Sequence, residues 1–222
     1  MKGLCLILAN VLVMIGFSQL DQSQQKYRDT IQHETSFIEN KGQVDGDSTL
    51  DILCYFQFQQ LTGFVHEGGG ITFQFQHNQN EEGGELNKLS KNHKPLPQLA
   101  NQETHRVDME LLHANPSPTI RFEDFSGSYS NYYTKNALQA RHFGRIVFEN
   151  VYSKIDWVLY FSEGQFKYDF IVKPGGNPVD IKMAYYHFDS IAITKNGDLC
   201  ITTRLGSFFD ECPQSYQGNK QI

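Results

Sequence analysis

Two aspartates on neighbouring predicted strands are the residues best placed for acid–base chemistry. The segments IDWVLYF and GQFKYDFIV, joined by Ser-Glu-Gly, predict a β-hairpin whose arms carry Asp156 and Asp169. Glycoside hydrolysis needs two carboxylates roughly 5 to 10 Å apart, a separation that two hairpin arms can provide. Alternation places Asp169 opposite the aromatic face of Phe166, Tyr168 and Phe170, so a surface carboxylate is the simpler interpretation. A catalytic pair of Asp156 and Asp169 is therefore the weaker alternative.

A second group of oxygen ligands precedes a predicted strand. Asp45, Asp47, Thr49 and Asp51 alternate along the chain, as ligands do in calcium loops. The segment lacks the glycine expected at the sixth loop position, and Phe56 replaces the closing bidentate glutamate at the twelfth. A polar turn is favoured, and calcium binding stays a weak alternative.

The best ligand-binding candidate is an aromatic cluster interleaved with Ser, Asn and Gly. Five rings fall within twelve residues: Phe122, Phe125, Tyr129, Tyr132 and Tyr133. Aromatic rings beside small polar groups suit sugar or peptide surfaces, because the rings give contact area and the hydroxyls orient the partner. The competing interpretation is that half of these rings fill the core. The predicted ligand-binding residues are Phe125, Tyr129, Tyr132 and Tyr133.

Cysteine and histidine spacing predicts neither a metal centre nor a cofactor. No HExxH and no CxxC motif occurs in the chain. Cys54 alternates with Ile52 and Phe56, which predicts a small core residue. Cys200 and Cys212 are the cysteines that a disulfide would join, closing a modest loop, although their spacing is not specific.

Strand patterns dominate the rest of the chain. Ile71, Phe73 and Phe75 alternate with polar residues, and Asn196-Gly197 lies at the centre of a predicted hairpin. Short strands at intervals of about 8 to 12 residues, without a long helical period, indicate an all-β fold. We expect an antiparallel β-sandwich, with two packed sub-sheets, over residues 37–217. A polar stretch over residues 77–104 predicts a long exposed loop.

The N-terminus predicts export. Lys2 precedes an apolar run from Leu4 to Phe17, which is shorter than the about 20 residues of a membrane span. We expect residues 1–18 to be a signal peptide cleaved before Gln19, residues 19–36 a polar segment and residues 218–222 a C-terminal tail; an uncleaved anchor is the alternative. Cleavage removes only one charged residue and leaves 18 basic against 25 acidic residues, a net charge of −7. An acidic chain without basic runs argues against nucleic-acid binding and against docking on anionic lipids.

Two phrases carry a resemblance to a known family. FIENKGQVDG (Phe37 to Gly46) and ECPQSYQ (Glu211 to Gln217) resemble the opening and closing signatures of an uncharacterised N-terminal domain, which heads secreted bacterial proteins with seven-bladed-propeller repeats. Such proteins are typical of gliding bacteria with type IX export. The resemblance covers nearly the whole mature chain, and it implies a cell-surface address and a propeller neighbour without implying a reaction.

The sequence therefore predicts a secreted or cell-surface, non-enzymatic interaction module. Its expected partner is a propeller domain, a surface glycan or a surface protein. The alternatives are a carbohydrate-active hydrolase that uses the paired aspartates, and a truncated head domain without an independent role.

Overall fold

The computed structural model describes residues 5–12, 35–44, 51–58, 61–78, 102–217 and 220–221, and these residues form an all-β structure. Two single turns of 3-10 helix, η2 (Tyr133–Lys135) and η3 (Pro178–Asp180), are the only helical elements among them. The strands are β1 (Cys5–Leu12), β2 (Phe37–Glu39), β3 (Ile52–Phe58), β4 (Leu61–His66), β5 (Gly70–Asn78), β6 (Gln102–Leu111), β7 (Thr119–Tyr132), β8 (Ala137–Tyr152), β9 (Ile155–Ser162), β10 (Gln165–Val172), β11 (Met183–Tyr186), β12 (Ser190–Ile193), β13 (Leu199–Thr203), β14 (Gly206–Asp210), β15 (Gln214–Gln217) and β16 (Lys220–Gln221).

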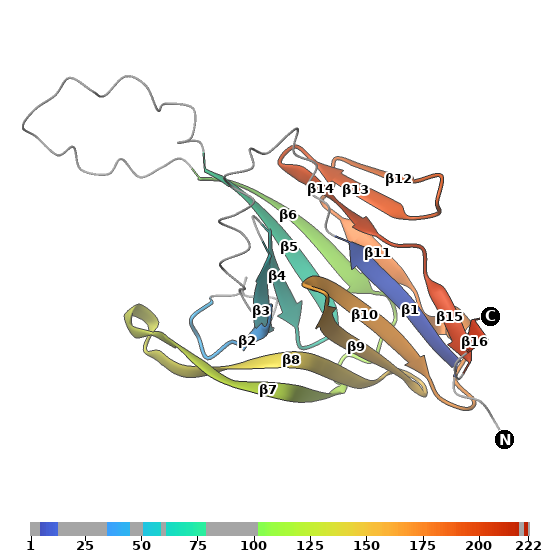
Figure 1. Cartoon of the computed structure of the whole chain (residues 1–222), viewed down its shortest axis with the longest axis horizontal. Coiled ribbons are helices and arrows are strands. Elements are labelled where there is room, and N and C mark those ends of the chain that lie inside the picture. Colours follow the sequence, from blue (N-terminus) through green and yellow to red (C-terminus); the bar gives the residue numbers. More distant parts are fainter. Residues whose placement is uncertain are drawn as a thin grey trace, which may run out of the picture.

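The two layers of the fold diverge from one long strand, β8. Along one edge β8 pairs with β7, while its other edge is shared by β2, near Phe143, and β9, from Arg145 onward. One layer then continues in the order β2-β3-β4-β5-β6-β11, and the other in the order β9-β10-β1-β14-β13-β12. Figure 1 shows the ribbon of β7 and β8 running beneath both layers. Every strand pairing among the described residues is antiparallel, so the predicted antiparallel sandwich is confirmed.

Aromatic side chains from the two layers meet in the core. The ring of Phe56 on β3 stacks on that of Phe166 on β10, with centroids 4.6 Å apart. Phe73 on β5 packs against Phe208 on β14 at 4.9 Å. Such pairs contribute about 0.5–1.5 kcal/mol each beyond their buried area. Aromatic side chains from both layers therefore pack against each other and hold the two layers of the sandwich together.

The local strand predictions hold in detail. The β9–β10 hairpin turns at Glu163 and Gly164, both with positive φ, as a two-residue type I′ loop requires. Phe73 and Phe75 lie in the core, as their alternation predicts, and so do Cys54 and Trp157. β5 extends to Asn78 and β6 starts at Gln102, so strand structure reaches slightly into the predicted polar loop, whose centre lies outside the described residues.

The segment predicted to be a signal peptide contains β1. This strand lies between β10 on one side and β14 and β15 on the other (Figure 1). The structure is that of the whole chain, including residues 5–12, so cleavage of the signal peptide stays a prediction. No helix in the described parts of the chain is long and apolar enough to cross a membrane.

Candidate binding surface

The β7–β8 ribbon presents the aromatic residues that the sequence singled out. β7 has 14 residues and β8 has 16, and the side chains of β7 are mostly exposed from Asp124 onward. Register shifts after Phe125 and after Ser130 interrupt the ladder, and Asn136 takes a left-handed conformation at the tip. Such bulges bend a strand and redirect its side chains.

Three of the four predicted ligand-binding rings are exposed on this ribbon. The exposed fractions are 45% for Phe125, 54% for Tyr129 and 79% for Tyr133. The rings of Phe125 and Tyr129 pack edge to face with centroids 5.3 Å apart, and Phe125 leans on the buried ring of Phe143 at 5.7 Å. Phe125 and Tyr129 are therefore held in place before any partner arrives, which lowers the entropic cost of binding.

Tyr132, the fourth predicted residue, is half-buried, and its side chain contacts another strand. Its hydroxyl forms a hydrogen bond with the hydroxyl of Tyr55 on β3. Burial raises the pKa of Tyr55, with the hydrogen bond to Tyr132 as a second cause. This contact ties the ribbon to the first layer, so Tyr132 supports the surface more than it forms it.

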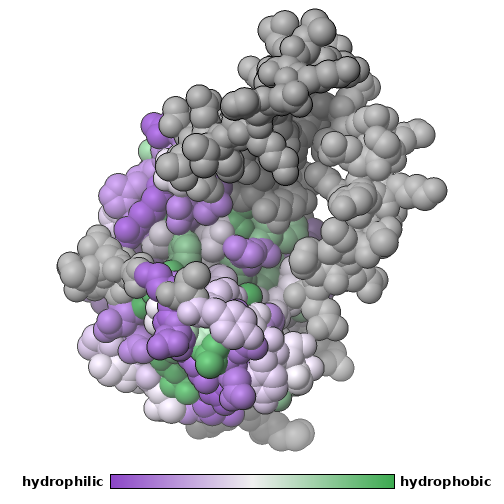
Figure 2. All heavy atoms as spheres, turned by 90° about the vertical axis from the view of Figure 1, so that its left-hand side faces the viewer, coloured by the Kyte–Doolittle hydropathy of each residue, from purple (hydrophilic) through white to green (hydrophobic). Residues whose placement is uncertain are grey.

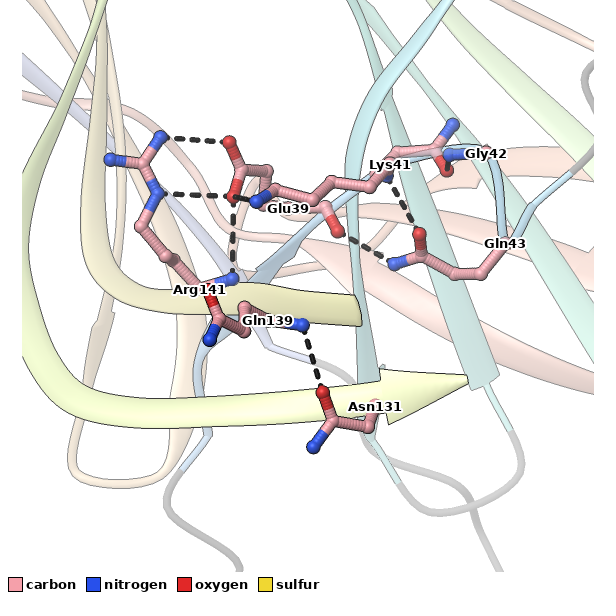
Figure 3. Close-up of polar contacts among 8 residues, drawn as sticks. Glu39, Lys41, Gly42, Gln43, Asn131, Gln139 and Arg141 are labelled. Carbon is pink, nitrogen blue, oxygen red and sulfur yellow. Dashed lines mark hydrogen bonds and ion pairs between the residues drawn. The ribbon is translucent and has the colours of Figure 1, made fainter. Parts of the chain in front are cut away.

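A charged clamp adjoins the aromatic face. Arg141 on β8 grips the carboxylate of Glu39 on β2 through two side-chain hydrogen bonds of 3.0 and 2.8 Å, and its backbone N–H donates a third at 3.3 Å (Figure 3). These bonds hold the pKa of Glu39 below its usual value, although partial burial opposes the shift. The guanidinium also lies 5.1 Å from the ring centroid of Phe143. The clamp therefore fixes the ribbon against β2 and places a cation beside the rings.

The FIENKGQ phrase forms the loop behind this clamp. The side chain of Asn40 donates to the carbonyls of Val44 and Ile52, and its Oδ1 accepts the N–H groups of Gly42 and Val44. Figure 3 shows Gln43 reaching back to the carbonyl of Glu39. The phrase therefore closes a turn and positions Glu39.

His142 lies on the same strand and was not anticipated from the sequence. Its Nδ1 is 3.0 Å from the hydroxyl of Ser36, and its Nε2 is 2.8 Å from the hydroxyl of Ser130. A serine beside a histidine can act in nucleophilic catalysis. Here both ring nitrogens are engaged by hydroxyls, one before β2 and one on β7, an arrangement that fastens β2 to the ribbon.

Phe125, Tyr129 and Tyr133 form an exposed aromatic face. On the side of the molecule that faces the viewer in Figure 2, hydrophobic patches are small and lie within a hydrophilic surround. The two cavities described below are lined by other residues than Phe125, Tyr129 and Tyr133. An open aromatic face suits an extended polymer, whereas enclosed cavities suit small molecules.

The two candidate acid–base residues come close together. The register pairs Asp156 with Ile171 and Asp169 with Val158. The two aspartates are therefore diagonal neighbours on one face of the hairpin, with Cα atoms about 7 to 8 Å apart. Asp156 already accepts hydrogen bonds from Lys173 at 2.7 Å and from the backbone N–H of Asn150 at 2.8 Å. Asp169 accepts one from Tyr160, and burial raises the pKa of Asp169 to about 6. The shared face is compatible with the catalytic hypothesis, but Asp156 is bound in an ion pair with Lys173.

The remaining predicted sites receive less support from the structure. Asp45, Asp47 and Thr49 lie outside the described residues, and Asp51 is exposed. In the part of the chain that is described, no three His, Cys, Asp or Glu residues gather as a metal site. Cys200 and Cys212 are free thiols. Cys212 lies beside Gly197, about three residues or 10 Å further along the hairpin than Cys200, and a disulfide needs closer Cα atoms.

A polar network around the buried Asp108 was not predicted from the sequence, and it adjoins a cavity. The carboxylate of Asp108 accepts hydrogen bonds from Thr72 at 2.5 Å and from Arg106 at 2.7 Å, and lies 2.8 Å from Nδ1 of His187. Burial by itself would raise the pKa of Asp108, but these hydrogen bonds outweigh it and lower the pKa. The adjoining cavity has a volume of about 480 Å³. Both carboxylate oxygens of Asp108 have hydrogen-bond partners. The network therefore joins β5, β6 and the segment after β11.

A second missed network surrounds Asp210. The hydroxyls of Tyr168 and Tyr185 donate to its carboxylate at 2.9 and 2.8 Å, and burial raises its pKa to about 6. A mostly apolar cavity of about 350 Å³ opens beside it. The only sequence signal was an aspartate at the end of an apolar strand, which gave no indication of its tyrosine partners.

The comparisons with known proteins place the chain by family. A family model described as a domain of unknown function, DUF7948, matches residues 37–222. The chain belongs to this family. The match begins at Phe37, where the sandwich was expected to start, and includes the whole of the β7–β8 ribbon with its aromatic face. No curated protein and no solved structure matches the chain.

Proposed function

We propose that the chain is an exported, non-enzymatic interaction module that binds an extended polymer, a surface glycan or a polypeptide, on the aromatic face of the β7–β8 ribbon. The carrying observation is the exposed, prearranged pair of Phe125 and Tyr129. Aromatic residues concentrate binding energy at interfaces, and exposed rings held by their neighbours lose little freedom on binding. The predicted signal peptide and the acidic charge support an extracellular surface role. The resemblance to propeller-bearing proteins supports a propeller domain or a cell-surface component as the neighbour.

Affinity electrophoresis of the exported chain through gels of soluble polysaccharides tests the proposal, with a peptide array for polypeptide partners. We expect retardation or array binding that Tyr129→Ala and Phe125→Ala each weaken about 10- to 100-fold, the range expected for aromatic interface residues. Tyr186→Ala is the matched control, because Tyr186 is an exposed tyrosine on β11, far from the ribbon in the sheet order. The proposal fails if the wild-type chain binds nothing, or if all three variants bind alike.

The same polysaccharide panel addresses the second candidate, a carbohydrate-active hydrolase. The diagonal placement of Asp156 and Asp169 and the raised pKa of Asp169 favour it. Release of reducing ends that is abolished in both Asp156→Asn and Asp169→Asn would rank the hydrolase above the binding module. Intact polysaccharide after long incubation would remove it.

A further inference from the structure

β1 is paired along both of its edges within the second layer. Six residue pairs join it to β10, from Cys5 opposite Val172 to Asn10 opposite Lys167. Its other edge is joined by four pairs to β15 and by two pairs to β14. β1 is therefore an inner strand of the sheet, as Figure 1 shows, and not an appendage at its edge.

The same residues belong to the segment that the sequence predicts to be removed on export, so the following inference rests on the proposed export of the chain. A chain that begins at Gln19 has no β1. The backbone of Lys167–Val172 on one side of the gap, and of Gln214–Gln217 on the other, would then lack its pairing partner. Unpaired strand edges are templates for another strand, and a gap between two edges offers two such templates at once.

The floor of the gap is built for apolar side chains. On β10, the residues Tyr168, Phe170 and Val172 alternate with polar or half-buried ones, and all three are at most 4% exposed. The ring of Phe170 stacks on the fully buried Trp157, with centroids 6.3 Å apart. A strand that fills the gap must therefore carry apolar residues at alternate positions, opposite these three.

We propose that the exported chain binds an extended strand of a partner polypeptide in the gap between β10 and β15. The strand runs antiparallel to both, in the register of β1, with apolar residues at every second position. The chain's own residues 19–36, QLDQSQQKYRDTIQHETS, are too polar to supply such a strand. Recognition therefore combines backbone pairing, which gives affinity, with the alternating floor, which selects the sequence.

The test uses the chain secreted with its own leader, with its N-terminus determined by mass spectrometry. The probe is a fluorescent, lysine-tagged peptide of residues 5–12 that carries Cys5→Ser. We expect saturable binding by fluorescence anisotropy, with slower hydrogen exchange at residues 167–172 and 214–217. A Leu8→Pro peptide should bind at least about tenfold more weakly, because residue 8 pairs with both Asp169 and Gln214 and proline has no N–H to donate.

Disulfide trapping tests the register. In a Cys200→Ser, Cys212→Ser background, Lys167→Cys should cross-link to a peptide with Asn10→Cys in preference to one with Leu8→Cys. Asp169→Cys should show the opposite preference. Equal cross-linking of both peptides to both variants would mean that the peptide has no fixed place, and would overturn the proposal.

Three further results would overturn it. One is a secreted chain that retains residues 5–12, since the gap is then already filled. Another is a mature chain whose residues 167–172 and 214–217 are protected without peptide, since β10 and β15 have then closed on each other. The third is a dimer in which a second copy supplies the protection. Tyr129→Ala should leave peptide binding unchanged, so loss of polymer binding at the aromatic face and failure of strand binding are separate results.

Discussion

Adding one methyl group to Gly63 should destabilise the sandwich core. Gly63 on β4 pairs with Phe56 on β3, and the ring of Phe56 lies across the glycine. A Cβ atom at this position would lie 2.1 Å from Cζ of Phe56, where ordinary contacts begin at 3.4 Å. The ring has little room to retreat, because it stacks on Phe166 at 4.6 Å and meets Phe37 edge to face at 5.7 Å. Overpacking of this kind costs about 1–3 kcal/mol.

Urea unfolding followed by the fluorescence of Trp157, the one tryptophan of the chain, measures this loss. We expect Gly63→Ala to lower the free energy of unfolding by about 1–3 kcal/mol, or the Tm by about 2 to 4 °C for each kcal/mol. Gly68→Ala is the control: its nearest neighbour is a carbonyl oxygen at 4.0 Å, so it should be neutral or gain up to about 1 kcal/mol.

A double-mutant cycle identifies the cause. Phe56→Leu shortens the ring and makes room for the methyl group of Gly63→Ala. The double variant should therefore be more stable than the sum of the single effects predicts, by about 1 kcal/mol or more. A Gly63→Ala chain as stable as wild type, or single effects that simply add, would refute the reasoning that the ring of Phe56 occupies this space.

Three further predictions concern the polar residues that the sequence did not connect. Burial raises the pKa of Asp210 from 3.8 to about 6, so the folded chain keeps a proton that the unfolded chain releases, and this group's contribution to stability is lost as the pH rises from about 4 through 6. Asp210→Asn in the full-length chain should thus gain about 2–3 kcal/mol relative to wild type between pH 4 and pH 7.5 in urea unfolding, and an equal difference at both pH values would contradict this. Asn40→Ala should cost about 2–4 kcal/mol, since four hydrogen bonds are lost, with faster proteolysis in the 40–44 loop; unchanged cleavage would count against that role. Asp108→Asn should cost about 1–3 kcal/mol at pH 7 and less at pH 3, because the stability that comes from a lowered carboxylate pKa is progressively lost as the pH falls below the unfolded value of 3.8; a loss independent of pH would argue against the charged network.

Local chemistry was enough to predict the strands and their buried faces. The alternation of Phe73 and Phe75 with glutamine and threonine, and the turn residues Glu163-Gly164, each act within a few residues of chain. Cys54 and Trp157 also lie in the core, although burial on their strands does not alternate: Tyr55 beside Cys54 is buried as well, and so are all of residues 155–159. The exposed rings Phe125, Tyr129 and Tyr133 also followed from the sequence as candidates, although not their surroundings.

Only the tertiary structure decided which strands lie opposite one another. Glu39 and Arg141 are 102 residues apart, and Asp108 and His187 are 79 apart, so nothing in either local pattern links the partners. Alternation places Tyr129 and Tyr132, three residues apart, on opposite faces of β7, but it does not identify Tyr55, 77 residues away, as the partner of Tyr132. An alternating pattern fixes which face of a strand is buried, because burial depends on each residue's own chemistry. It leaves open which distant strand covers that face, because pairing depends on register and layer packing across the whole chain.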